Sequence, residues 1–316
     1  MGAQEEATTR KIDPLVSTAW LEARLGEAAD AGLIVIDIRE PRLYEVGHIP
    51  GSISIPFSPM SDWAVSDDEL LMELPPDDDL FAFLARWGID RDSSVVLVGT
   101  VEPPPAPPYA LSDAPRVAAT LFYAGVTDVA ILEGGYPRWQ AEGRTATREA
   151  SALTGGPAQV GSSEIGASDT QQAAPKGEGA SRGSVASGLF VSTDYVKEHL
   201  DRVVLLDGRD PDQYFGVTPC PFAGVGGHIP TARSLPAPWM WKPDGTYKSV
   251  EVLRAMAGGV IGADQDQEVI AYCGVGGYAA AWWFVLTQIL GYRDVKIYDG
   301  AAEAWAKSDP MVSYTW

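Results

Sequence analysis

The sequence has few of the residues that most often bind metals or form disulfides. Only two cysteines, Cys220 and Cys273, and three histidines, His48, His199 and His228, occur in 316 residues. Two cysteines are too few for a disulfide scaffold or a cysteine-rich metal site, and three histidines leave little for a histidine-based one. We therefore expect no metal and no organic cofactor, and we expect any role of cysteine to be that of a reagent.

Positive charge and long apolar runs are also scarce. The chain has 23 Lys and Arg against 43 Asp and Glu, a net charge of −20, which would repel nucleic acid and anionic membranes. No apolar run approaches the roughly 18 residues that a bilayer-spanning helix needs, and the first fifteen residues lack the apolar stretch of a signal peptide. We expect no nucleic-acid or membrane partner. A cytoplasmic location is the default expectation, and a periplasmic or exported one applies if a leader has been removed.

What the sequence does contain is enough apolar side chain for two cores. Hydrophobic residues make up 46% of the chain, and 316 residues at roughly 150 per domain suggest two domains. Between them, residues 144–188 consist mainly of Gly, Ala, Ser, Thr and Gln, a composition that cannot offset its ordering entropy by burial. We expect domains at 10–143 and 189–316, joined by a flexible linker at 144–188.

The two predicted domains repeat one another. The strand LIVIDIRE with Asp37 and Arg39 matches VVLLDGRD with Asp207 and Arg209, and a GHIP segment follows in both copies. Further on, YAGVTDVAILEGGYPRW matches LGYRDVKIYDGAAEAW. Such detailed correspondence indicates an internal duplication. Because strands alternate with helices, each copy is expected to be an α/β domain with a mostly parallel sheet flanked by helices.

The copies differ after one strand, at a sheet edge where ligands gather in parallel α/β folds. The first copy has VVLVGT followed by a proline-rich stretch, whereas the second has EVIAYC followed by GVGGYA. Three glycines allow successive backbone N–H groups to converge on one point at a helix N-terminus. We expect these donors to lower the pKa of the Cys273 thiol and to stabilise a persulfide. The predicted cradle consists of Gly274, Val275, Gly276, Gly277, Tyr278 and Ala279.

This arrangement suits sulfur transfer. A thiolate attacks the outer sulfur of a donor, and a second nucleophile later removes that sulfur. The alternative for Cys273 is an inert cysteine at a strand end. The loop also fits the dinucleotide pattern G-x-G-x-x-A, with Asp299 twenty residues beyond Ala279. A dinucleotide fold, however, begins with such a unit and needs further strands after it.

The chain resembles the tandem-domain rhodaneses, the thiosulfate and 3-mercaptopyruvate sulfurtransferase family. The resemblance is carried by both GHIP segments, both Asp-x-Arg strand ends, the segment Ala114–Val117 (APRV), the GGYPRW ending and the Cys273 loop. It implies an inactive N-terminal domain, a catalytic C-terminal domain, and a cleft between them in which Cys273 carries a persulfide. Phosphatases of similar fold have the longer loop Cys-x5-Arg, which clamps phosphate. Here Ala279 stands in place of that arginine.

The residues that select the donor depart from the family pattern. Thiosulfate enzymes have basic residues after the cysteine and mercaptopyruvate enzymes a Gly-Ser pair, whereas this chain has Gly274 and Val275. A second family arginine falls on Gln213. The substrate-binding candidates are therefore Arg209 and Gln213, although Arg209 also fits a strand-end arginine paired with a neighbouring carboxylate. Thiosulfate is the favoured donor and 3-mercaptopyruvate the alternative, with cyanide or a thiol as acceptor.

Cys220 lies in an insertion, Phe215–Gly227, that the first copy lacks. It is a candidate second thiol that would resolve the Cys273 persulfide or receive its sulfur, and the alternative is a lone loop cysteine. His48 and His228 belong to GHIP segments, where the imidazole is expected to brace the backbone. The rival to a sulfurtransferase is a non-catalytic persulfide carrier or sensor that delivers sulfur to a protein partner.

Overall fold

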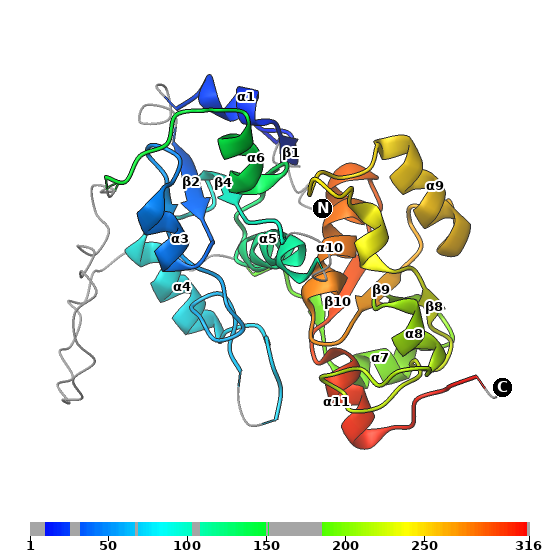
Figure 1. Cartoon of the computed structure of the whole chain (residues 1–316). Coiled ribbons are helices and arrows are strands. Elements are labelled where there is room, and N and C mark those ends of the chain that lie inside the picture. Colours follow the sequence, from blue (N-terminus) through cyan, green and yellow to red (C-terminus); the bar gives the residue numbers. More distant parts are fainter. Residues whose placement is uncertain are drawn as a thin grey trace, which may run out of the picture.

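The computed structural model describes residues 10–25, 32–66, 69–102, 108–149, 151 and 185–314. It contains two five-stranded parallel sheets (Figure 1), with strand orders β1-β5-β4-β2-β3 and β6-β10-β9-β7-β8. The predicted tandem α/β architecture is confirmed. The strands of the first sheet are β1 (Leu15–Val16), β2 (Leu33–Asp37), β3 (Ile53–Ser54), β4 (Ser94–Val98) and β5 (Asp128–Leu132). Those of the second are β6 (Phe190–Val191), β7 (Val204–Asp207), β8 (Arg233–Ser234), β9 (Val269–Tyr272) and β10 (Val295–Tyr298).

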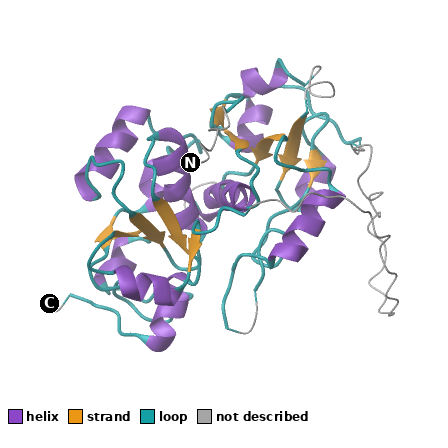
Figure 2. Cartoon of the chain, turned by 180° about the vertical axis from the view of Figure 1, so that it is seen from behind, coloured by secondary structure: helices purple, strands orange, loops and turns teal. Residues whose placement is uncertain are grey.

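Helices cover both sheets, which lie on either side of a helical layer in the view from behind (Figure 2). The helices of the first half are α1 (Thr18–Glu22), α3 (Pro41–Val46), α4 (Asp77–Arg86), α5 (Asp113–Tyr123) and α6 (Gly135–Ala141), with a 3₁₀ turn at η1 (Tyr109–Ser112). Those of the second half are α7 (Thr193–His199), α8 (Pro211–Phe215), α9 (Val250–Val260), α10 (Gly277–Phe284) and α11 (Ala301–Ser308), with short turns at η2 (Ala237–Met240) and η3 (Val285–Ile289).

The two sheets share one register, as expected for a duplication. Asp37 at the end of β2 lies opposite Val98 of the middle strand β4, and Asp207 at the end of β7 lies opposite Tyr272 of the middle strand β9. All residues of β4 and β9 are buried. Uninterrupted apolar strands of this kind are typical of parallel sheets covered on both faces. The residue after β9 is Cys273, so the thiol stands at the carboxyl end of the middle strand.

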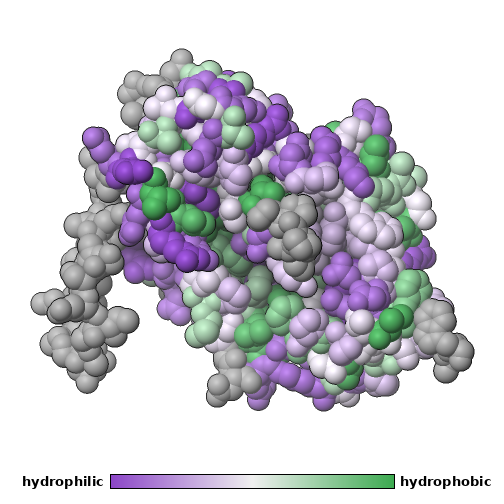
Figure 3. All heavy atoms as spheres, in the orientation of Figure 1, coloured by the Kyte–Doolittle hydropathy of each residue, from purple (hydrophilic) through white to green (hydrophobic). Residues whose placement is uncertain are grey.

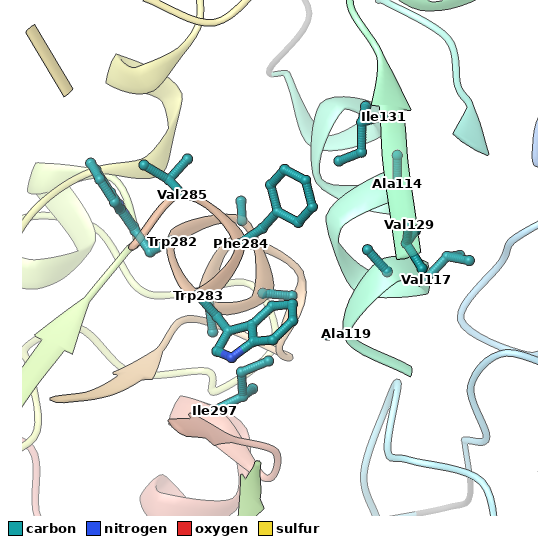
Figure 4. Close-up of a cluster of buried hydrophobic side chains, with 14 of the residues drawn as sticks. Ala114, Val117, Ala119, Val129, Ile131, Trp282, Trp283, Phe284, Val285 and Ile297 are labelled. Carbon is teal, nitrogen blue, oxygen red and sulfur yellow. The ribbon is translucent and has the colours of Figure 1, made fainter. Parts of the chain in front are cut away.

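The two domains meet where α5 of the first packs against α10 of the second. Every residue of α10 is buried, which explains why its run AAAWWF shows no polar face. Phe284 and Trp283 are directed toward α5 (Figure 4), and the ring centroids of Phe122 and Trp283 are 5.2 Å apart. A single hydrophobic cluster therefore continues from one domain into the other.

A buried ion pair crosses the same boundary. Arg116 on α5 is completely buried, and its Nη1 lies 3.0 Å from Oδ1 of Asp299, which follows β10 in the second domain. Arg116 Nη2 donates to the carbonyl of Met72 at 2.5 Å. The backbone N–H of Leu74 in turn donates to Asp299 Oδ2 at 2.7 Å. The guanidinium and the carboxylate thus join two domains and fix the segment around Met72 between them.

The described ends of the expected linker contact the first domain. Thr147 and His48 exchange two backbone hydrogen bonds of 2.9 Å, and the N–H of Ala186 donates to the carbonyl of Tyr123 at 2.9 Å. The predicted flexible segment between these ends, residues 152–184, lies outside the described residues. In the part of the chain that the structure describes, every helix is too short or too polar to cross a membrane.

We predict that Arg116→Met lowers the free energy of unfolding by about 3 kcal/mol, because removing one partner of a buried ion pair leaves the other charge without compensation. Urea denaturation followed by tryptophan fluorescence measures the loss. Arg86→Met is the matched control, since the Arg86–Asp62 pair has side chains that are 56% and 57% exposed and should cost less than about 1 kcal/mol. Equal losses in the two variants would contradict a special role for the interdomain pair.

Candidate active site

Cys273 is held in place by its own strand and by the helix that follows β10. The N–H of Ala302 on α11 donates to the Cys273 carbonyl at 2.9 Å, and the N–H of Glu303 donates to the Gly274 carbonyl at 3.2 Å. These bonds use two of the N–H groups that a helix start leaves without intrahelical partners. The first turn of α11 therefore fixes the backbone on which the thiol stands.

The glycine loop closes around the sulfur as a ring of backbone donors. Gly276 has a φ of +102°, in the left-handed region that favours glycine, and its N–H donates to Cys273 Sγ at 3.1 Å. The N–H groups of Val275, Tyr278 and Ala279 also act on the thiol. Four of the six predicted cradle residues, Val275, Gly276, Tyr278 and Ala279, thus act on one sulfur atom at the N-terminus of α10.

The pKa of the Cys273 thiol departs from the expectation. Burial raises this pKa, and the four backbone N–H groups lower it only in part, so that the net shift is upward. The prediction of a lowered thiol pKa is therefore wrong. The local donors were evident from the loop sequence, whereas the burial, which leaves Cys273 only 4% exposed, depends on the other domain and on an insertion.

The thiol opens onto a cavity between the two domains, with a volume of about 470 Å³. Its walls combine the Cys273 loop with aromatic and apolar side chains, including Phe57, Met72 and Tyr109 of the first domain and Phe222 of the second. The space-filling view shows hydrophobic and hydrophilic side chains mixed along the domain boundary (Figure 3). A cavity of this size accommodates a small sulfur donor or acceptor.

Arg209 and Gln213, the predicted substrate-binding residues, both line the cavity. Arg209 donates from Nε to Asp207 Oδ1 at 3.0 Å and from Nη2 to Asp207 Oδ2 at 2.5 Å. Nη2 also donates to the Gly227 carbonyl at 2.7 Å. Its pairing with a neighbouring carboxylate, the alternative interpretation of the sequence, is therefore present. Substrate contact by either residue stays a prediction.

Carboxyl groups in the cavity wall were missed by the sequence interpretation. Glu102, Asp113 and Asp210 lie there together with the Cys273 loop. Burial, reinforced by Glu102, raises the pKa of Asp113 to about 8, so this carboxyl is largely protonated at neutral pH. The position of Asp113 directly before the APRV segment was visible in the sequence, but its place in the wall of the cavity depends on the docking of α5 against α10.

The GHIP histidines brace the backbone, in line with the sequence interpretation. His48 contacts the carbonyls of Tyr44 at 2.9 Å and Glu149 at 3.0 Å, and His228 contacts the carbonyl of Tyr214 at 3.0 Å. Each imidazole stacks on the tyrosine whose carbonyl it contacts. Neither histidine is among the residues that line the cavity. Across the described residues, no group of three or more His, Cys, Asp or Glu side chains is placed to hold a metal ion.

We predict that the alkylation rate of Cys273 by iodoacetamide rises with pH with a midpoint above that of a free thiol. The raised pKa keeps the thiol protonated up to higher pH, and only the thiolate reacts. The Cys220→Ser variant isolates the Cys273 signal, and glutathione is the reference thiol. A midpoint at or below that of glutathione would show that the loop donors outweigh burial.

Known proteins share both the domains and their order. The rhodanese-like domain family matches residues 17–142 and 192–308. The sulfur carrier protein TtuD of Thermus thermophilus is 30% identical, over 92% of this chain and 93% of that protein. A thiosulfate sulfurtransferase of Corynebacterium glutamicum is also 30% identical, over 92% of this chain and 87% of that protein.

Solved structures show the same arrangement. YnjE superimposes with a TM-score of 0.73 at 25% identity, covering 96% of this chain and 69% of that one. Wild-type EanB superimposes with a TM-score of 0.74 at 22% identity, covering 96% and 70%, and shows the fold alone. With two matched domains and these relatives, the chain belongs to the rhodanese family as a tandem-domain member.

Proposed function

We propose that the protein is a sulfurtransferase that moves sulfane sulfur through a persulfide on Cys273. The observation that carries this proposal is the position of Cys273 Sγ inside a ring of backbone N–H groups and at the wall of the interdomain cavity. A ring of fixed donors favours a negative sulfur species without supplying the guanidinium that a phosphate site needs. A relative named thiosulfate sulfurtransferase, identical at 30% of positions, supports the same activity.

The cycle consists of two displacements at sulfur. The Cys273 thiolate attacks the outer sulfur of thiosulfate; the S–S bond of the donor breaks, and sulfite leaves with the bonding electron pair. The new persulfide then carries its negative charge within reach of the loop donors. In the second displacement cyanide attacks the terminal sulfur and leaves as thiocyanate, or a thiol attacks it and leaves as a persulfide. With either acceptor, the second displacement returns Cys273 to its unloaded state.

Burial of Cys273 affects the first step, in which the thiol takes sulfur from the donor. The raised pKa of Cys273 keeps its sulfur largely protonated as a thiol, so a proton must leave as the donor reacts. The carboxylates of the cavity wall work against a small dianion, and the protonated Asp113 lessens that repulsion at neutral pH. Because thiosulfate is a dianion and 3-mercaptopyruvate a monoanion, these charges bear on which of the two donors the site accepts.

A persulfide carrier is the second candidate, and the relative named sulfur carrier protein TtuD favours it. In a carrier the Cys273 persulfide would persist in the presence of small nucleophiles and pass its sulfur to a protein. The two candidates share the loading step and differ in the unloading step. Turnover with a small acceptor therefore separates them.

We predict that one equivalent of thiosulfate adds one sulfur atom to the wild-type chain and none to Cys273→Ser, because Cys273 is the loading thiol. Intact-protein mass spectrometry measures the gain, and a parallel sample with 3-mercaptopyruvate tests the alternative donor. Added cyanide should remove the sulfur and release thiocyanate repeatedly under excess donor. A stable persulfide with negligible thiocyanate turnover would favour the carrier, and no sulfur gain from either donor would refute the proposal for small donors.

A further inference from the structure

A second thiol lies beside the Cys273 loop, although it is 53 positions away in the sequence (273 − 220). Cys220 belongs to the insertion Phe215–Gly227 and is 0% exposed. A Cβ placed on Gly274 would lie 3.4 Å from Cys220 Sγ and 2.8 Å from the ring of Phe222. The insertion is therefore folded onto the residue next to Cys273, with its sulfur facing the loop.

The position of Cys220 is fixed by its own turn. Its N–H donates to the Val225 carbonyl at 2.9 Å, and its carbonyl accepts from the N–H of Gly224 at 2.8 Å. Gly226 lies close to Gly216 at the base of the insertion, where a Cβ on Gly226 would meet the Gly216 Cα at 2.9 Å. This closed base and the inner turn hold the thiol in a defined place, so its proximity to the loop is a property of the fold.

An arginine with an unused donor lies in the same region. Arg209 is 2% exposed and lines the cavity, and its Nη1 has no hydrogen-bond partner among the described residues, whereas its other two nitrogens bind Asp207 and Gly227. Burial lowers the pKa of Arg209, but Asp207 and, more weakly, Cys220 raise it above its ordinary value. Tyr109 lies within electrostatic range of both cysteine sulfurs. A buried donor without a partner is costly unless a ligand completes it.

We propose that Cys220 is a second sulfur site, which accepts the outer sulfur of the Cys273 persulfide while Arg209 balances the negative charge that arrives with it. This inference rests on the proposed function, because it needs the Cys273 persulfide as its donor. Cys220 sulfur attacks the terminal sulfur; the S–S bond on Cys273 breaks and an S–S bond forms on Cys220. The Cys220 proton passes to the departing Cys273 thiolate, so no oxidant or reductant is consumed.

Transfer to Cys220 empties the loop while the sulfur stays in the protein. Cys273 then accepts a second sulfur from the donor, and the chain holds two sulfane sulfurs at once. Because Cys220 is fully buried, it is reached from Cys273 and not from solvent. The order of loading is therefore Cys273 first and Cys220 second.

The test is sulfur stoichiometry on the full chain, with thiosulfate or 3-mercaptopyruvate in excess. Intact mass gives the number of sulfurs, and alkylation followed by peptide mapping assigns them to one cysteine or the other. We expect two sulfurs on the wild type, one on each cysteine, one sulfur on Cys220→Ser, and none on Cys273→Ser. Val217→Ala is the matched control, since Val217 belongs to the same insertion and is 61% exposed; it should load two. Cys220→Ala replaces Cys220→Ser if the hydroxyl disturbs folding, and its intact loading of Cys273 shows that the site is formed.

Four outcomes would overturn the inference. A wild type that stops at one sulfur on Cys273, or that carries both sulfurs on Cys273, would show that Cys220 accepts nothing. Sulfur on Cys220 in the Cys273→Ser variant would show direct loading in place of transfer. A Cys220–Cys273 disulfide with release of hydrosulfide would show attack on the inner sulfur. No sulfur on Cys273 in any variant would refute the proposed function itself, a result distinct from failure of the transfer alone.

Discussion

The docking of α5 onto α10 is the constraint on which the site depends. All eight residues of α10 are buried, so the second domain alone cannot cover the helix that carries Gly277, Tyr278 and Ala279, the C-terminal half of the cradle. The first domain supplies this cover with α5, and its Arg116 pairs with Asp299 of the second domain next to the glycine loop. A Cβ on Gly276 would lie 3.8 Å from Arg116 Nη1 and 3.9 Å from Asp299. A copy without a thiol is thus needed to hold the cradle of the other.

The docking of the two domains also affects the pKa of the Cys273 thiol. Backbone donors favour a negative sulfur, while enclosure by two domains and an insertion disfavours it, and for the thiol the enclosure prevails. Fixed donors do not need to reorganise when charge develops, so their contribution grows in a water-poor cavity. The arrangement therefore fits the proposed persulfide, whose negative charge would appear during the reaction, better than a thiolate that is charged at rest.

The fold and the ring of backbone donors were predictable from the sequence, because both depend on local sequence patterns. The repeated Asp-x-Arg strand ends, the GHIP segments and the buried strands gave the tandem α/β fold, and three glycines after Cys273 indicated the ring of donors. The direction of the thiol pKa and the role of Asp113 were not predictable, because both arise from contact between domains. Sequence spacing reports what lies along one chain segment, whereas desolvation depends on every element that packs over it.

The difference between the copies also has a local cause at the Asp-x-Arg position. Both arginines bind the aspartate two residues before them and a GHIP glycine carbonyl, Gly47 or Gly227. In the first copy Tyr136 covers Arg39, with the guanidinium 3.8 Å from the ring centroid. If the paired tryptophans Trp139 and Trp305 are aligned, Ala302 takes the place of Tyr136 in the second copy.

This exchange does not expose the second arginine, since Arg209 is 2% exposed against 6% for Arg39 and its guanidinium lies 5.5 Å from the ring centroid of Tyr272. The backbone contact is the same in both copies: the N–H of Ala302 donates to the Cys273 carbonyl at 2.9 Å, as the N–H of Tyr136 donates to the Gly99 carbonyl at 3.0 Å. The duplication therefore keeps one backbone contact and changes the side chains on either side of it, from Tyr136 and Gly99 in the first copy to Ala302 and Cys273 in the second.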